Sequence, residues 1–589
     1  MSETTPRPTD SLWLGSAAPT AYSPLDGDCE VEVAVIGGGI AGISVALALK
    51  RDGARVAVLE RGVIAGGATG FTTAKVSVLQ ETKYADIRKL HGDDAAAAYA
   101  GASLAAVERI DALVREEQLD CAWERLTACT YAAEEQQIDA VEREAEAALA
   151  AGLAVQVGSR TPLPFAVPLA VSLADQGQFH PVSYVRGLAA AVDGDGSYVF
   201  ESTAVAGVEE GSPCRVRTLD GATVSARDVV VATNYPLLDR GLFFARMEAA
   251  RSYVIAARIR GNAPEGMLIT AGSPTRSVRP YHDGHGTWVL VGGEGHLTGS
   301  TQAQPERFAV LERFAREHFD VVDIPYRWSA QDGMPTDKLP YIGPYTPRST
   351  HLFVAGGFQK WGMTGATIAA TLLADRLAGR ENPYATVFDP NRLSVRSAPQ
   401  VAKAQLWVAR HFVGDRLTPA QADCAEVAPG QARVVRSGLG KVGVYRDEDG
   451  ATHGVSLRCT HLGCLVHFNA AERTWDCPCH GSRFDIDGEV LAGPAVEPLE
   501  PRDTPDQEVV AATHAPGEEG GSAGPLGRLT NDLDSTAGRV AWYGGLGVMA
   551  ALEVIDWPVA LLLGATRLVA RHARGRAVRR FASETEDPA

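Results

Sequence analysis

Positive charge is scarce in this sequence of 589 residues: 55 lysines and arginines stand against 72 aspartates and glutamates, for a net charge of −17. A chain of this charge repels phosphate backbones, which argues against a nucleic-acid partner. The segment 1–30 lacks a basic stretch followed by an apolar run, and it lacks a twin arginine. We therefore expect no secretory signal and a cytoplasmic protein. No internal repeat is visible either.

Cysteine is used sparingly, with nine over the whole length, and four of them fall between positions 459 and 479. The other five show no metal-ligand spacing, and we expect them to be reduced thiols: Cys29, Cys121, Cys129, Cys214 and Cys424.

Apolar residues are plentiful, since 45% of the chain is hydrophobic, and the length leaves room for roughly three or four domains. The composition changes near 381–400 and again at 514–527, where glycine, proline and glutamate gather as in a flexible linker. These changes divide the chain into a large N-terminal unit, a smaller unit and a tail.

Two short strings in the smaller unit carry the most specific signal, Cys459-Thr-His461 and Cys477-Pro-Cys479-His480. Two thiolates on one iron and two imidazoles on the other form the ligand set of a Rieske [2Fe–2S] centre, an electron carrier. The C-x-H and C-x-x-H spacing fits no zinc finger well. We predict Cys459, His461, Cys477 and His480 as the ligands, with the histidine-bound iron exposed. The alternative is a zinc ribbon on the four cysteines of this segment, which leaves both histidines without a role.

The segment 453–500 closely resembles the Rieske proteins of quinol-oxidising respiratory complexes, including the Gly493-Pro494 pair of their third loop. The resemblance implies a disulfide between Cys464 and Cys479, with two reduced, buried thiols as the alternative. It also implies that the Ser482 hydroxyl donates to the cluster. Where those proteins carry a donating tyrosine, this chain has Phe484, so we expect a reduction potential below the top of the class range. We interpret His453 and His467, which lie off the spacing, as surface or packing residues.

A second motif lies in the N-terminal unit. The apolar run 31–36 predicts a buried parallel strand, the glycines Gly37, Gly39 and Gly42 follow at once, and a helix and a second strand lead to Glu60. Gly37 permits a tight turn, Gly39 lets the backbone approach a pyrophosphate, and Gly42 lets helix and strand pack closely. Glu60 is placed to bind the ribose hydroxyls. The pattern predicts a dinucleotide-binding fold.

The order of further motifs resembles the D-amino-acid-oxidase-like flavoprotein family over about 11–385. The carriers are Ser11-Leu-Trp13, the glycine- and threonine-rich stretch 66–75, the strand 229–232, the Asp-Lys-Leu-Pro-Tyr-Ile-Gly string at 337–343, and the strand and glycine-rich turn at 352–365. The resemblance implies non-covalent FAD, with these further contacts: Thr72, Thr73, Gly356, Gly357, Gly362 and Thr364.

The same resemblance implies an antiparallel substrate sheet at roughly 245–335. Alternating and β-branched residues predict its strands at 251–258, 266–270 and 287–291. We interpret the glycine-rich string 292–296 as a turn at the end of a strand, because it is not followed by an acid-terminated second strand. The chain then has no evident site for NAD(P)H. The candidate catalytic residues are Lys360, Trp361, Tyr341 and Arg276. Tyr281 and His282 are further candidates for facing the substrate.

The tail holds an apolar run at 540–563 followed by six arginines. Glu553, Asp556 and Pro558 interrupt the run, and each acid costs about 2.5–3.5 kcal/mol at a bilayer centre, so a simple span is disfavoured. Two short helices docked on the protein are the favoured interpretation. Peripheral contact with the inner face of a membrane through 540–580 is the second, and a span is the third.

These patterns predict an α/β, Rossmann-like FAD-binding domain of the glutathione-reductase type with an antiparallel-sheet substrate domain, followed by a small all-β Rieske domain and a helical tail. The predicted boundaries are an N-terminal extension at 1–30, the oxidoreductase at 31–390, the Rieske domain at 400–512, a linker at 513–530 and the tail at 531–589.

The predicted function is an FAD-dependent dehydrogenase that oxidises a small amine or amino acid and passes electrons one at a time through the cluster to a protein or quinone acceptor. One alternative reverses the flow, so that the flavin is reduced through the cluster. Another is a redox sensor that controls membrane or partner docking through the tail. A Rieske oxygenase is disfavoured, because no two histidines and a carboxylate stand at non-heme iron spacing.

Overall fold

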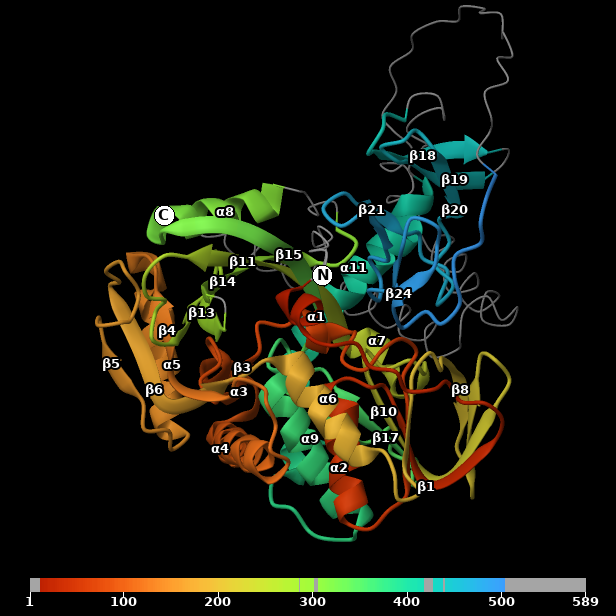
Figure 1. Cartoon of the computed structure of the whole chain (residues 1–589), viewed down its shortest axis with the longest axis horizontal. Helices are drawn as coiled ribbons and strands as arrows, with labels where there is room; N and C mark the ends of the chain where they lie inside the picture. Colours follow the sequence, from red (N-terminus) through yellow and green to blue (C-terminus); the bar gives the residue numbers. More distant parts are fainter. Residues whose placement is uncertain are drawn as a thin grey trace, which may run out of the picture.

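A computed structural model of the chain describes residues 11–284, 286–300, 306–392, 394–417, 427–437 and 440–503. Figure 1 shows the two large sheets of the N-terminal unit side by side with the small C-terminal sheets, which the chain enters through the long helix α11 (Ala398–Leu417). The described residues therefore form a nucleotide-binding layer, a second sheet and a cluster-bearing part.

The first sheet follows the dinucleotide pattern. Its order is β16-β17-β10-β1-β2-β7, with β8 and β9 attached beside β10. β1, β2, β10 and β17 pair in parallel, and their central residues are buried on both faces, as expected where helices cover a parallel sheet. The strands are β1 (Cys29–Ile36), β2 (Val56–Leu59), β7 (Tyr198–Phe200), β8 (Val205–Glu209), β9 (Cys214–Thr218), β10 (Thr223–Asn234), β16 (Tyr341–Pro344) and β17 (Leu352–Gly356).

Helices cover this sheet, and further helices lie beside the second sheet. α2 (Ile40–Arg51) and α9 (Gly362–Leu377) are buried along most of their length and pack together (Figure 1). The other helices are α1 (Leu12–Ser16), α3 (Lys83–His91), α4 (Asp93–Glu116), α5 (Ile138–Ala150), α6 (Pro181–Val192), α7 (Phe243–Arg246), α8 (Glu306–His318) and α10 (Ala385–Phe388). Single 3-10 turns lie at η1 (Ala68–Phe71), η2 (Glu135–Gln137), η3 (Arg240–Leu242) and η4 (Val395–Ser397).

The second sheet has the order β15-β11-β14-β13-β12-β4-β6-β3, with β5 on β6. It draws strands from two parts of the chain, and β12 pairs with β4 in parallel where those parts meet, so the sheet is mixed at that one junction. The strands are β3 (Lys75–Val76), β4 (Glu124–Ala132), β5 (Gln156–Gly158), β6 (Leu169–Gln178), β11 (Met247–Ile259), β12 (Met267–Thr270), β13 (Arg276–Asp283), β14 (Gly286–Leu297) and β15 (Val321–Pro335).

The predicted turn at 292–296 is wrong. β14 continues through it, and Gly292 and His296 still pair with β11. The register shifts between Arg251 and Tyr253, opposite the point where Glu294 adopts a φ of 54°, so the glycines accommodate an irregularity inside the strand.

The cluster-bearing part consists of two small antiparallel sheets. β18 (Ala432–Ser437), β19 (Gly440–Arg446) and β20 (Thr452–Ser456) form one. The other contains β21 (His467–Asn469), β22 (Thr474–Asp476), β23 (Arg483–Phe484) and β24 (Val490–Ala492). Short strands joined by tight turns make an all-β unit, as the sequence predicted.

The apolar and basic tail, with its predicted contact through 540–580, lies outside the described residues. Among the residues that are described, no helix is both long and apolar enough to cross a bilayer.

Candidate metal centre and flavin site

The two predicted cluster loops have the same local geometry. In the first, Gly463 N donates to Cys459 O at 3.0 Å, and in the second Gly481 N donates to Cys477 O at 3.0 Å. Gly463 and Gly481 both have a φ of 77°, in the left-handed region that favours glycine. Each loop therefore turns back within five residues and presents its cysteine and histidine to the same space.

The four predicted ligands lie together, and both histidines keep a buried ring nitrogen without a hydrogen-bond partner. Cys459 and Cys477 are 2% and 1% exposed, their thiols lie within hydrogen-bonding reach of one another, and the rings of His461 and His480 are 5.0 Å apart. Nδ1 of each histidine is buried without a hydrogen-bond partner. Orphaned buried nitrogens beside two free thiols fit a bound [2Fe–2S] cluster, which would take those atoms as ligands.

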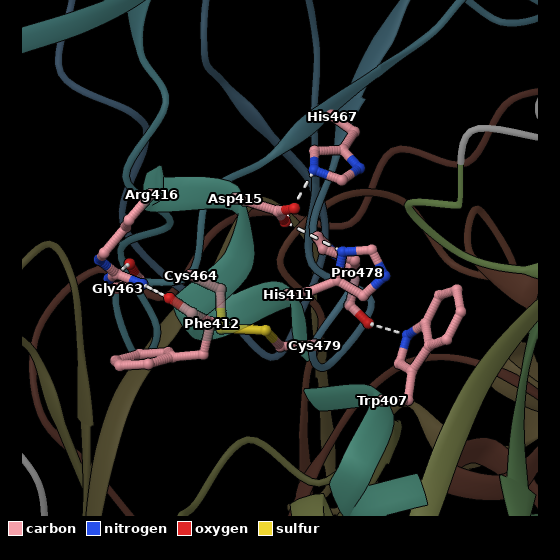
Figure 2. Close-up of a disulfide and its surroundings, with 10 residues drawn as sticks. All are labelled: Trp407, His411, Phe412, Asp415, Arg416, Gly463, Cys464, His467, Pro478 and Cys479. Carbon is pink, nitrogen blue, oxygen red and sulfur yellow. Dashed lines mark hydrogen bonds and ion pairs between the residues drawn. A yellow bond between two sulfur atoms is a disulfide. The ribbon is translucent and has the colours of Figure 1, made fainter. Parts of the chain in front are cut away.

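The structure joins Cys464 and Cys479 by a disulfide, with their Cα atoms 6.5 Å apart, as the sequence predicted (Figure 2). The bond ties the two loops together next to the ligands. It also removes two of the four sulfurs that the zinc-ribbon alternative needs. Of the five cysteines expected to be reduced, four are free thiols, and Cys424 lies outside the described residues.

The side chains of Ser482 and Phe484 lie on the same side as the ligands. The Ser482 hydroxyl is fully buried, accepts a hydrogen bond from Ala495 N at 3.0 Å, and donates toward the Cys459 sulfur. Phe484 is fully buried in the small core of this unit and offers no donor. The arrangement agrees with one side-chain hydrogen-bond donor to the cluster, where the respiratory Rieske proteins that this segment resembles have two.

The histidine edge of the cluster site, formed by His461 and His480, is covered by other side chains. This corrects the expectation that the histidine-bound iron is exposed. The His461 side chain is 6% exposed and its Nε2 lies 2.7 Å from an oxygen of Asp239. His480 is 3% exposed, and its ring meets the edge of Phe244, with centroids 5.6 Å apart. Asp239 and Phe244 belong to the oxidoreductase part, so the two predicted histidine ligands face the flavin domain. The sequence gives no signal of this docking.

A chain of hydrogen bonds links the second cluster loop to the nucleotide sheet. Gln331 Nε2 donates to Gly481 O at 2.7 Å, and the backbone carbonyl of Gln331 accepts from Asn234 Nδ2 at 3.1 Å. Thr298 Oγ1 donates to Gln331 Oε1 at 3.0 Å, which fixes the orientation of the amide. Asn234 in turn pairs with Gly356, the first glycine of the predicted flavin turn.

Buried charges hold the same interface. Arg251 on β11 is 1% exposed and lies 2.5 Å from Glu472 of the cluster-bearing part. Arg483 pairs with Glu472 at 3.2 Å and with Asp476 at 3.0 Å, and all of these side chains are largely buried. The network satisfies each charge with an opposite one, which a buried ion requires.

Glycines allow the closest approaches across the interface. A Cβ added to Gly481 would lie 2.3 Å from the Cβ of Ala249, and one added to Gly299 would lie 2.4 Å from Pro478 N. Both glycines also have a positive φ, of 77° and 70°.

The predicted dinucleotide motif lies at the carboxyl end of β1, at the start of α2. A Cβ on Gly42 would lie 1.9 Å from Gly37 O, and one on Gly37 would lie 2.7 Å from Ala232 O, so both positions need glycine for packing. A Cβ on Gly39 would meet only Thr69 Oγ1, at 3.2 Å. Gly39 therefore borders open space at a helix N-terminus, where a pyrophosphate binds. These residues fit FAD.

Glu60 stands beside this turn at the end of β2. Its carboxylate accepts hydrogen bonds from Gly38 N at 2.7 Å and Gly62 N at 2.8 Å, and burial raises its pKa. Thr69, which sequence reasoning missed, accepts from Ile40 N at 3.0 Å and so caps the start of α2. A threonine inside a glycine-rich stretch is the only signal that could have indicated it.

The other predicted FAD contacts surround the same region. Thr72 O accepts from the Trp13 indole at 2.6 Å, so the N-terminal helix α1 supports this loop. Gly357 has a φ of 70°, and a Cβ there would lie 2.6 Å from Pro335. Thr73 follows Thr72, while Gly362 and Thr364 open α9, where the Thr364 hydroxyl donates to Ser77 O at 3.2 Å. Their contact with FAD stays a prediction.

The candidate catalytic residues have different surroundings in the structure. Tyr341 is 1% exposed and its hydroxyl donates to Arg246 O at 3.3 Å, which gives it a packing role. Arg276 is paired with Glu294 at 2.8 Å, so its charge is already neutralised. Tyr281 packs edge-on against Trp13, and His282 is exposed at the end of β13.

Lys360 and Trp361 lie on the turn between β17 and α9. Trp361 is 8% exposed, whereas Lys360 is exposed with a φ of 73°. Sequence reasoning missed two acids near Lys360. Burial raises the pKa of Asp332, and Lys360 opposes that shift by its charge and its backbone N–H. Burial likewise raises the pKa of Glu81, again opposed by Lys360. The two acids come from distant segments, 81 and 332, so no local pattern indicates them.

Fold and sites together define a flavoprotein oxidoreductase that carries an iron–sulfur electron carrier. The family of FAD-dependent oxidoreductases matches residues 32–376, and the Rieske [2Fe-2S] domain family matches 420–505. The chain belongs to the FAD-dependent oxidoreductase family, binds FAD, and holds a [2Fe–2S] cluster in its Rieske domain. Both matches lie inside the predicted domains, whose boundaries stay a prediction.

One relative spans both parts of the chain, and another matches a fifth of it. YhfW of Bacillus subtilis, named as a Rieske 2Fe-2S iron-sulfur protein, is 35% identical over 83% of this chain and 97% of its own length. The cytochrome b6-f iron-sulfur subunit of Fritillaria agrestis is 36% identical over 20% of this chain and 49% of its own.

Solved structures share the fold of the FAD part. Glycine oxidase from Geobacillus kaustophilus aligns over 62% of this chain and 99% of its own, with a TM-score of 0.53 and 21% identity. L-Proline dehydrogenase from P. horikoshii gives a TM-score of 0.51 at 18% identity over 62% and 98% of the two chains.

Proposed function

We propose that this protein is a dehydrogenase of a small amine or amino acid. It would deliver the electrons one at a time, through its cluster, to a protein or quinone acceptor. In such a reaction a substrate C–H bond breaks with loss of hydride, the nitrogen releases a proton, and a C=N bond forms. FAD supplies the hydride acceptor and the cluster supplies one-electron carriage. The two electrons leave in two successive one-electron transfers to the external acceptor.

The observation that carries the proposal is the covered histidine edge. A cluster that served only an external partner would present its histidines to solvent, yet Asp239 and Phe244 cover them from the flavin domain. The hydrogen bonds through Gln331 and Asn234 connect the second cluster loop to β10, which pairs through Asn234 with Gly356 of the predicted flavin turn. These contacts between the two parts support electron exchange between the cluster and the flavin.

The substrate class is inferred from the charges beside the flavin turn. Lys360 is exposed there, and Asp332 and Glu81 lie close enough to interact with it. A cation and two carboxyl groups complement the carboxylate and ammonium of an amino acid. Structures with this fold include proteins named as glycine oxidase and L-proline dehydrogenase, which supports the same class.

Anaerobic mixing of the holoenzyme with a panel of amines and amino acids tests the function. We expect one member of the panel to bleach the flavin absorbance first and the visible bands of the cluster afterwards. Reduction by NADH alone would overturn the proposal, because the hydride donor would then be a nicotinamide and not an amine. Absence of any response, together with tail-dependent binding that changes with redox state, would favour the sensor.

The interdomain path has its own test. Gln331→Leu removes the donor to Gly481 O, and Gln405→Leu is a matched control, since Gln405 Nε2 also bonds across the interface, to Ala245 O at 3.0 Å, but away from the path. Loss of either hydrogen bond costs about 0.5–1.5 kcal/mol, which changes the ratio of docked to undocked protein roughly two- to tenfold in both variants. We expect cluster bleaching after flavin photoreduction to be slower in Gln331→Leu than in Gln405→Leu, because only Gln331 lies on the path. Equal rates in both variants would contradict the path.

A further inference from the structure

Three metal-ligating side chains converge outside the cluster site. His411 and Asp415 are one turn apart on α11, and His467 begins β21. Asp415 Oδ2 lies 3.0 Å from His411 Nδ1 and 3.0 Å from His467 Nε2. Figure 2 shows both imidazoles turned toward this one carboxylate, beside the disulfide. The sequence placed His467 among ordinary surface or packing residues because its partners lie far away in the chain.

The tautomer of His467 makes this contact unusual. His467 Nδ1 lies 2.7 Å from Gly299 O, and a carbonyl can only accept, so Nδ1 carries the hydrogen. In the neutral ring Nε2 is then a lone pair, and it points at a carboxylate oxygen that is also only an acceptor. Two acceptors in contact need either a proton shared between His467 and Asp415 or a metal ion between them.

The surroundings of His467 match those of a metal ligand. A ligating histidine usually donates its other N–H to a backbone carbonyl or carboxylate, as His467 does to Gly299 O. Bonds of about 2.0–2.2 Å to nitrogen and oxygen place tetrahedral ligands roughly 3.3 Å apart, close to the observed separations. The side chains of His411, Asp415 and His467 are 11%, 21% and 23% exposed, so the group is enclosed but reachable from solvent.

We propose that His411, Asp415 and His467 bind a divalent transition-metal ion such as Zn²⁺, with water in the remaining position. The site is separate from the cluster and does not depend on the proposed function. Through these ligands the ion joins α11 to the Rieske sheet, and through His467 and Gly299 it joins both to the flavin domain. Metal occupancy then strengthens the docked arrangement.

Metal analysis of the full-length holoenzyme tests the proposal. Protein is incubated with Zn²⁺, passed through a desalting column, and assayed for zinc and iron by mass spectrometry. We expect one metal ion per chain beyond the two irons of the cluster. Asp415→Asn keeps the shape of the side chain but weakens the ligand, and His411→Ala removes one. In both variants the content of the extra metal ion should fall at least about tenfold, while the iron content stays at two per chain.

The matched control is His453→Ala. His453 also lies between carboxylates, 2.7 Å from Asp487 and 3.5 Å from Asp447, but no second histidine is near it in the described residues. This variant should keep its extra ion, and addition of Zn²⁺ should raise the thermal unfolding midpoint of wild type and of His453→Ala but not of Asp415→Asn. The proposal is overturned if wild type retains no more metal than Asp415→Asn, because the bridging cation is then a proton.

Discussion

The cluster loops and the flavin cradle position their groups in different ways. The cluster takes all four predicted ligands from residues 459–480, on two loops that turn within themselves and are tied by a disulfide. The predicted flavin contacts come from 37–73 and 356–364, and these segments meet only when β1, β10 and β17 pair in parallel. A local site survives changes elsewhere, whereas a distributed site requires the whole sheet. The interface between them depends on both.

The largest effect should come from Gly39→Ala, which tests the distributed site alone. The new methyl meets only Thr69 Oγ1 at 3.2 Å, so the fold tolerates it, but it occupies the space of the pyrophosphate. We expect flavin content to fall at least about tenfold while iron content is unchanged. Gly158→Ala, where nothing lies within 4 Å, is the control. Equal flavin-to-protein absorbance ratios in the two variants would refute the assignment of this turn.

Arg251→Met tests the interface and should come second. It leaves Glu472 buried beside a single partner, and breaking a buried pair costs about 3–5 kcal/mol. Arg258→Met on the same strand removes an exposed pair with Asp323, worth about 0–1 kcal/mol. We expect a clearly lower denaturation midpoint and faster proteolysis between the domains only for Arg251→Met. Similar midpoints for the two variants would show that the interface is weak.

A pH series on Glu144→Gln tests the stability of the flavin domain at a position outside the cluster site. The Glu144 carboxylate accepts from Tyr84 N and Ala85 N, and burial raises its pKa to about 8. Because this pKa lies above the unfolded value of about 4.3, the folded state keeps a proton that the unfolded chain releases. Glu144 therefore contributes stability that is lost as the pH rises from about 4.3 through 8.

The variant has no such proton, so its stability relative to wild type should rise over that window by at most about 1.4 kcal/mol per pH unit. Urea unfolding followed at several pH values measures the difference. Parallel curves for the two proteins would contradict the raised pKa, and iron content should be the same in both.

Ser482→Ala should have the smallest effect, on the local site alone. The Ser482 hydroxyl donates toward the Cys459 sulfur, and its loss removes one hydrogen bond that favours the reduced cluster. A bond of about 0.5–1.5 kcal/mol corresponds to roughly 20–60 mV for one electron. We expect a potential lower by that amount in a redox titration. Phe484→Tyr should shift it upward, and movement of both variants in one direction would reject this account.

Much of both sites was predictable because their signals are short-range or ordered. The spacing of Cys459, His461, Cys477 and His480 is itself the ligand pattern, and the glycines 37, 39 and 42 follow a strand directly. Asp332 and Glu81 were missed because only the tertiary fold brings these distant segments near Lys360. The covered histidine edge, the Gln331 bridge and the group around Asp415 were missed for the same reason, since each joins segments that are far apart in sequence.

Gly299 and Gly481 constrain the way this chain can change. Any side chain at either position would collide with Pro478 or Ala249 across the interface, and the positive φ of both residues already disfavours replacement. The two halves are therefore not interchangeable modules joined by a linker. A Rieske domain transplanted from another protein would need a glycine at the position of Gly481, and an oxidoreductase domain expressed alone would expose a surface shaped for one neighbour.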